Sequence, residues 1–116
     1  MMRNEMAKCL DDAARAVELI KQFTAGKTCE EYETDAMLRA AVERQFEIAG
    51  KALDRALRLS SDLAARLGGA DRIIALRDCL ARGLAGVPDE VAWGCVEASL
   101  PRLGHDLAAV IKEEAR

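Results

Sequence analysis

Apolar residues recur at steps of three and four along most of the chain, and this spacing predicts amphipathic helices. The first predicted helix covers about residues 4–24, and its apolar stripe consists of Met6, Leu10, Ala13, Val17, Ile20 and Phe23. The second covers about residues 35–59, and its stripe consists of Leu38, Val42, Phe46, Ala49, Leu53 and Ala56. Each helix therefore has one face that must be buried against a neighbour.

The second predicted helix contains several small residues, so parts of its surface carry little side-chain volume. These residues are Ala40, Ala41, Gly50 and Ala52. They predict that a neighbouring helix approaches closely there. Between the two long helices, Gly26 predicts the end of the first. Thr28 and Glu31 have the spacing of a capping box, so a short helical turn is expected to about residue 33.

The third predicted helix begins near Asp71, after a brief helix at about residues 62–66 and the pair Gly68-Gly69. Its stripe consists of Ile73, Leu76, Leu80 and Leu84. Gly83 and Gly86 predict its end.

The fourth predicted helix covers about residues 88–114, and Pro88 suits its first turn. Pro101 lies inside this segment. Because proline lacks an N–H and its ring clashes with the preceding turn, we expect the helix to be kinked or split near Ser99.

Short connections favour antiparallel neighbours, so the sequence predicts an all-α fold, an up-and-down bundle of four main helices with one or two short ones. Ala and Leu dominate the apolar residues, which favours helix over sheet. At 116 residues, the chain is expected to form a single domain, 1–116.

Composition excludes several kinds of site. Aromatic residues are 3% of the chain, too few for a platform that stacks single-stranded nucleic acid. His105 is the one histidine, so a metal site that uses several histidine ligands cannot form. We therefore expect no metal and no cofactor. With a net charge of -3, the chain lacks the positive electrostatic field that is expected of a protein that binds DNA backbones in general. No apolar run approaches the roughly 20 residues that cross a bilayer, so no membrane partner is expected.

The four cysteines are widely spaced and form no C-x-x-C pair. Cys9, Cys29, Cys79 and Cys95 follow no recognisable signal peptide, because the first residues lead straight into an amphipathic pattern. We therefore expect reduced, mostly packed thiols in a cytoplasmic protein.

His105 is expected on the polar side of the last helix, beside Asp106. It has no serine or cysteine at helical spacing with which to form a nucleophile pair. The simpler interpretation is a partly exposed surface histidine.

Three arginines recur every five residues and therefore point to different sides of the third predicted helix: Arg72, Arg77 and Arg82. Arg77 lies next to the apolar stripe, where an arginine needs a carboxylate or an anionic ligand. A salt bridge at the rim of the core is the simpler of these two explanations.

Three segments resemble HepT-like proteins, a family of the HEPN group. Residues 40–53, read AAVERQFEIAGKAL, are similar to the family's second helix, with its Ile-x-Gly. Residues 73–93 are similar to its third helix and exit, with Ile73, Leu76, Arg77, Leu80, Val87, Val91 and Trp93 in register. SLPRL, residues 99–103, is similar to the family's mid-helix Leu-Pro-x-Leu. The resemblance extends from about residue 11 to residue 111.

The resemblance implies a homodimer that partners a minimal nucleotidyltransferase of the MNT type in a toxin–antitoxin system. It also implies metal-independent cleavage of RNA by a motif of Arg, four to six residues, His, any residue and Tyr. In the family, the antitoxin blocks the toxin by adenylylating that tyrosine.

This chain departs from the family at the positions that carry the chemistry. The family's arginine corresponds to Arg77 and the following asparagine to Asp78, but the histidine corresponds to Arg82 and the tyrosine to Leu84. An arginine stays protonated and cannot exchange a proton near neutral pH. Leucine has no hydroxyl to accept a nucleotidyl group. The resemblance therefore implies a degenerate site in this chain.

Three hypotheses remain open. The first is a degenerate HepT-like dimer that binds a nucleotidyltransferase. Arg77 and Arg82 of both protomers would form a cleft that holds RNA or nucleotide phosphate. Of the expected partners, RNA is expected to bind only weakly. The second is an active ribonuclease with a divergent site, in which Asp78 or His105 acts as the base. The third is a generic helical interaction module.

Overall fold

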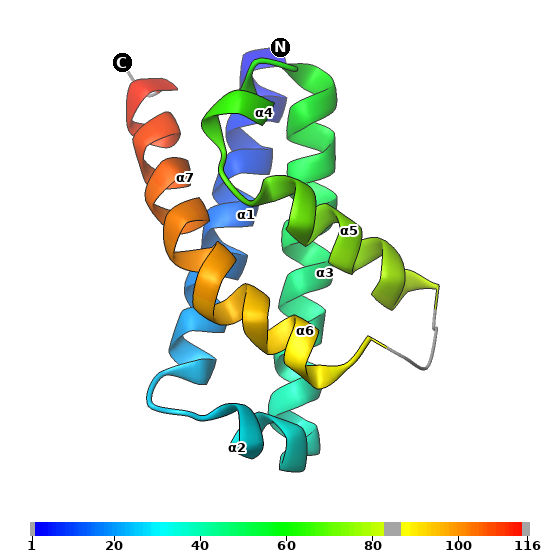
Figure 1. Cartoon of the computed structure of the whole chain (residues 1–116). Helices are drawn as coiled ribbons and strands as arrows, with labels where there is room; N and C mark the ends of the chain where they lie inside the picture. The colour runs from blue at the N-terminus through cyan, green and yellow to red at the C-terminus, as the bar shows by residue number, and fades with distance from the viewer. Residues whose placement is uncertain (1, 83–86, 115–116) are drawn as a thin grey trace.

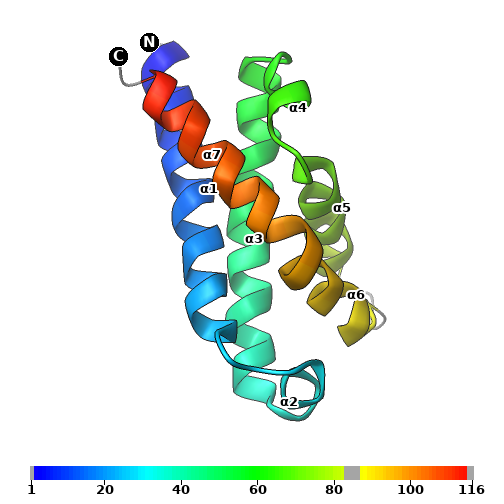
Figure 2. The same ribbon diagram turned by 60° about the vertical axis from the view of Figure 1, so that its left-hand side comes forward.

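The computed structural model describes residues 2–82 and 87–114, and every regular element in these ranges is helical. The two longest helices, α1 (Met2–Thr24) and α3 (Ala36–Leu59), lie side by side and antiparallel (Figures 1 and 2). Their predicted stripes form the centre of the core, since Leu10, Phe46 and Leu53 are fully buried. The predicted all-α fold is confirmed.

The connection between these helices contains α2 (Cys29–Thr34), which begins with the predicted capping box. The backbone N–H of Glu31 donates to Thr28 Oγ1 at 3.1 Å, and the backbone N–H of Thr28 donates to Glu31 Oε1 at 3.0 Å. On the inner face of α2, Tyr32 is fully buried, and its ring centroid lies 5.6 Å from that of Trp93. This contact joins the α2 end of the bundle to the last helical segment.

The short α4 (Leu63–Arg66) and the 12-residue α5 (Ala70–Ala81) follow, close to the predicted boundaries. Gly69 precedes α5 with a φ of 87°, a left-handed conformation that favours glycine. Gly83, Leu84 and Gly86, where the sequence predicts the end of this helix, lie outside the described residues.

The last segment consists of α6 (Asp89–Gly94), a π-helical turn η1 (Cys95–Ser99) and α7 (Leu100–Glu114). The disturbance of the helix that the sequence predicts near Ser99 is therefore present as a wide turn, in which the N–H of Leu100 donates to Cys95 O, five residues back, and the helical run continues through it. The wide turn lies directly before Pro101, whose ring would clash with the carbonyl of a regular helix.

The four main helices are α1, α3, α5 and the continuous run from α6 to α7. In both ribbon views α5 lies on α3, whereas α7 crosses α1 and brings the C-terminal end near the N-terminal end (Figures 1 and 2). All four cysteines are free; Cys9 and Cys95 are buried, and Cys29 and Cys79 are half-buried. The prediction of reduced, mostly packed thiols is thus consistent with the structure.

Candidate functional site

Arg77 lies on the face of α5 that packs against α3, and Gly50 of α3 makes its position available. A Cβ placed on Gly50 would lie 2.4 Å from Arg77 Cβ, 2.9 Å from Arg77 Cγ and 3.1 Å from the carbonyl oxygen of Ile73. The aliphatic stem of Arg77 therefore occupies the space that a side chain at position 50 would need. The close approach that the small residues predicted is confirmed at this glycine.

The guanidinium of Arg77 lies between two carboxylates. Its Nη2 donates to Asp54 Oδ2 at 3.3 Å, and its Nε lies 2.9 Å from Asp78 Oδ1. The buried Nε is nevertheless without a hydrogen-bond partner among the described residues, so the contact with Asp78 is an ion pair of poor alignment. Asp54 also lies 3.3 Å from Arg58 Nη2. Arg77 is therefore salt-bridged at the rim of the core, as the simpler explanation predicted.

Arg82 and Leu84 correspond to the family's histidine and tyrosine. Arg82 is exposed directly after the last turn of α5, and its backbone N–H donates to Asp78 O. Leu84 lies outside the described residues. Arg77 within α5 and Arg82 directly after it thus differ in environment, one held by carboxylates and the other in solvent.

His105 is exposed on α7, as expected, and makes no hydrogen bond or ion pair with any described residue. Its neighbour Asp106 accepts a hydrogen bond from the backbone N–H of Gly68 at 2.9 Å. In both ribbon views α7 runs away from α5 (Figures 1 and 2). The structure therefore brings Arg77 and Asp78 together and gives His105 no contact with either.

Neither Cys29 nor Cys95 is an activated thiol. Burial raises the pKa of the Cys95 thiol, and burial together with the Glu33 carboxylate raises the pKa of Cys29. A raised pKa keeps a thiol protonated near neutral pH, and the protonated form is a poor nucleophile. Within residues 2–82 and 87–114, no three His, Cys, Asp or Glu residues gather in a way that would hold a metal ion. No described helix is long and apolar enough to span a membrane.

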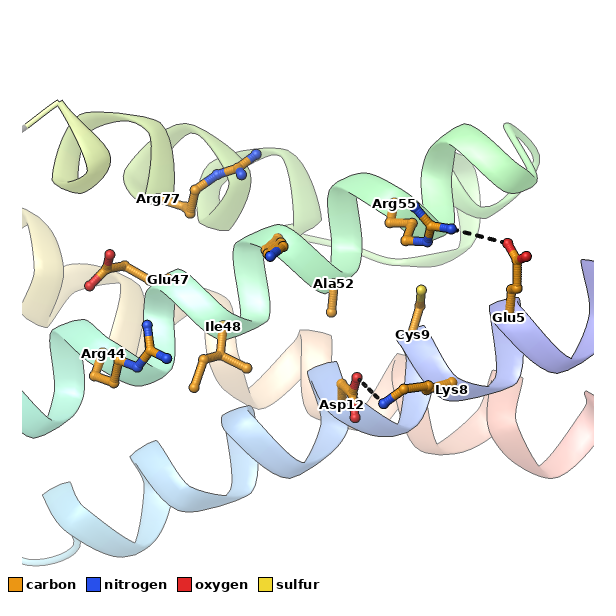
Figure 3. Close-up of a pocket in the computed structure, with 11 residues that line it drawn as sticks. Glu5, Lys8, Cys9, Asp12, Arg44, Glu47, Ile48, Ala52, Arg55 and Arg77 are labelled. Carbon is orange, nitrogen blue, oxygen red and sulfur yellow. Dashed lines mark hydrogen bonds and ion pairs between the residues drawn. The ribbon is translucent and has the colours of Figure 1, made fainter.

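A groove of about 590 Å³ runs beside Arg77 between α1, α3 and α5 (Figure 3). Arg77 lies on one side of α3, and the residues of α1 lie on the other (Figure 3). The basic residues that line it are Lys8, Arg44, Lys51, Arg55 and Arg77, and the acidic ones are Glu5, Asp12 and Glu47. Its remaining lining residues are Cys9, Ile48 and Ala52. The groove is thus polar at its walls, with an apolar patch within it.

Comparison with known proteins decides the family. A model of the HepT-like family, described as ribonuclease HepT-like, matches residues 13–110. The chain belongs to the HepT-like family. The match includes the segments that carried the resemblance, residues 40–53, 73–93 and 99–103.

A relative of this HepT-like chain is a protein of Methanocaldococcus jannaschii named "Gamma-glutamylcyclotransferase and putative RNase MJ0434". The two are 26% identical over 114 residues, which cover 97% of this chain and 50% of the relative. The chain thus spans half the length of that protein. No solved structure matches it.

Sequence reasoning identified Arg77 but missed the residue that holds it. Asp54 is one helical turn beyond Gly50, so the two lie on the same face of α3. When α5 packs on Gly50, Arg77 of that helix lies within reach of a carboxylate one helical turn beyond the glycine. The signal was present in the sequence, but it becomes visible only when α5 is known to be the neighbour.

Proposed function

We propose that this HepT-like chain is a catalytically degenerate member of a toxin–antitoxin-type system and acts as a dimeric binding partner of an MNT-type nucleotidyltransferase. HepT-like proteins are usually dimeric components of such systems, which supports the general assignment. The finer assignment depends on one observation, namely Arg82 at the position of the family's histidine. A guanidinium remains protonated near neutral pH and so cannot act there as a general base.

The partner role is tested by co-expression with a minimal nucleotidyltransferase of the MNT type. We expect the two proteins to co-purify through size-exclusion chromatography, with this chain as a dimer. A chain that stays monomeric at high concentration and never co-purifies with the nucleotidyltransferase would contradict the proposal.

The loss of catalysis is tested by comparing the natural chain with an Arg82→His, Leu84→Tyr double variant in a metal-free assay with RNA. We expect cleavage only by the double variant, because it regains the proton-exchanging side chain. A third variant, Leu84→Tyr alone, is the control and should remain inactive. Equal cleavage by the natural chain and the double variant would show that the assignment of Arg82 is wrong.

An active ribonuclease with a divergent site is the second candidate function, favoured by the description of the family and by the name of the archaeal relative. In that case Asp78 is the candidate base, because it lies 2.9 Å from Arg77 Nε. Cleavage by the natural chain that is lost in Asp78→Asn and kept in His105→Gln would establish this function.

A further inference from the structure

A second groove, of about 310 Å³, lies between α5 on one side and α6 and η1 on the other. Its walls are mainly aliphatic, with Leu76 from α5 and Val87 and Val91 from the opposite side. Val91 is 51% exposed and is one of two large apolar side chains among the described residues that are exposed. The groove therefore leaves apolar surface in contact with water, and a ligand that covers this surface gains free energy from its burial.

Arg72 is the only charged residue among the described residues that line this groove. It is exposed, and it forms no ion pair with a described residue. Its charge reaches the inside of the groove: burial raises the pKa of the Cys95 thiol, and a hydrogen bond with Ser99 and the positive charge of Arg72 oppose that rise. A ligand in the groove therefore meets one positive charge and no negative charge from the described lining.

An apolar wall beside a single guanidinium fits a ligand that has an apolar body and one negative charge. The planar fork of a guanidinium matches the two oxygens of a carboxylate. A phosphate monoester carries a charge of about −1.5 to −2 near neutral pH, which one arginine leaves partly uncompensated. Since a water-sized group occupies about 30 Å³ in the liquid, the groove has room for roughly ten non-hydrogen atoms. This is the size of a medium-chain fatty acid.

We propose that the groove between α5 and α6–η1 binds a medium-chain fatty carboxylate, whose carboxylate pairs with Arg72 and whose alkyl chain lies against Leu76 and Val91. A neutral molecule of the same length gains only the apolar contact. The site is separate from the groove beside Arg77, because the two grooves share no lining residue. The inference does not rest on the proposed partner role.

Two cysteines make occupancy of this groove measurable. Cys79 of α5 and Cys95 of η1 line it. Cys29 is half-buried like Cys79 but does not line the groove. A bound ligand should therefore shield Cys79 from a thiol reagent and leave the reaction of Cys29 unchanged, because access limits the reaction of a thiol.

The test measures binding of octanoate and of octanol to the purified full chain at low salt, by isothermal titration calorimetry. We expect a dissociation constant below about 1 mM for octanoate, and roughly tenfold weaker binding of octanol because it has no charge to pair with Arg72. Arg72→Gln should weaken the binding of octanoate roughly tenfold and change that of octanol less than about twofold.

Arg15→Gln is the matched control for Arg72→Gln. Arg15 is exposed on α1, forms no ion pair with a described residue and does not line the groove, and its replacement changes the net charge equally. It should change the affinity for either probe less than about twofold, because salt screens a distant surface charge.

A change of shape tests the apolar part of the site. Ala75 is exposed and lines the groove, so the larger side chain of Ala75→Leu should take the space of the alkyl chain. We expect it to weaken the binding of both probes at least about tenfold, since several methylene groups then lose their burial. Ala109→Leu places the same side chain on an exposed position of α7 and should leave both affinities unchanged. Circular dichroism of each variant confirms that it is folded.

Thiol labelling locates the bound ligand. With octanoate at about ten times its dissociation constant, the reaction of Cys79 with a maleimide should slow roughly tenfold, while that of Cys29 stays the same, as mass spectrometry of the labelled peptides would show. Equal affinities for octanoate and octanol, equal effects of Arg72→Gln and Arg15→Gln, or equal slowing at Cys79 and Cys29 would each overturn the proposal, as would a lack of binding. None of these results depends on co-purification with a nucleotidyltransferase, so failure here is distinct from failure of the proposed function.

Discussion

At the scale of single residues, Gly50 determines how closely α5 approaches α3. Its missing side chain provides the space for the stem of Arg77. Every other consequence for the site, including the reach of Arg77 to Asp54, depends on this approach.

Gly50→Ala should destabilise the fold by about 1–3 kcal/mol, because the new methyl group would overlap Arg77 Cβ and force the helices apart. Gly94→Ala is the control, since a Cβ on that helical residue meets nothing within 4 Å. There the better helix propensity of alanine should stabilise the protein by about 0.5–1 kcal/mol. Urea unfolding followed by circular dichroism measures both free energies, and equal effects at the two glycines would contradict this account.

Tyr32 has a buried polar atom for which the described residues offer no hydrogen-bond partner. Its side chain is fully buried, and its hydroxyl has no hydrogen-bond partner among the described residues. Burial, followed by the negative charges of Glu43 and Asp89, raises the pKa of this phenol above its ordinary value of 10.0. The ionised form is thus disfavoured in the folded state.

Tyr32→Phe should increase the free energy of unfolding by about 1 kcal/mol, since it removes an unsatisfied buried hydroxyl. The folded-state pKa is raised, so the folded state holds its proton at a pH where the unfolded state has lost it. The natural chain should therefore lose stability as the pH rises above about 10. Urea unfolding between about pH 8 and pH 11 checks this, and the decline should be smaller in Tyr32→Phe. Parallel pH profiles of the two proteins would refute it.

At the scale of elements, one local signal defines its structure fully, whereas another predicts only that the helix is disturbed. The capping box of α2 is predicted from Thr28 and Glu31 alone, because its two hydrogen bonds are made within four residues. The π-helical turn before Pro101 is different. Proline predicts a break, but a wide turn, a kink and a full separation all relieve the same clash, and the packing of the last segment selects among them.

Thr28→Ala should cost about 1 kcal/mol of stability, because the backbone N–H of Glu31 loses its acceptor. Thr28 is exposed, so little packing is lost with the side chain. Thr28→Ser keeps the hydroxyl and should restore the free energy of unfolding to within about 0.5 kcal/mol of the natural value. A loss of similar size in both variants would show that the cap does not stabilise α2.

At the scale of the whole molecule, the helices are held by packing and ion pairs rather than by covalent links among the described residues. The four cysteines are distributed over α1, α2, α5 and η1, and all are free. Arg66 of α4 and Glu113 of α7 form an ion pair that joins distant parts of the chain. The folded arrangement of the described residues thus contains no disulfide.

The unfolding midpoint should be the same with and without a reducing agent. A thiol reagent should titrate four thiols in the unfolded protein. In the folded protein, buried Cys9 and Cys95 should react more slowly than half-buried Cys29 and Cys79, because access limits the reaction. Fewer than four thiols in denaturant, or a midpoint that falls on reduction, would show that a disulfide forms.

The sequence by itself determined the helices, their buried faces, the disturbance of the helix before Pro101 and the resemblance that the family match confirmed. These features follow from local spacing and from residues that act within one or two helical turns. It also predicted a salt bridge for Arg77, because a charge near the core needs a counter-charge wherever it lies.

Only the tertiary structure decided which carboxylates supply that counter-charge. Asp54 is 23 residues from Arg77 in the chain, and the two meet because Gly50 lets α5 lie directly on α3. The groove lined by α1, α3 and α5 also exists only after these helices pack. Contacts between separate helices depend on the angle and distance at which they cross, and no short stretch of sequence contains that information.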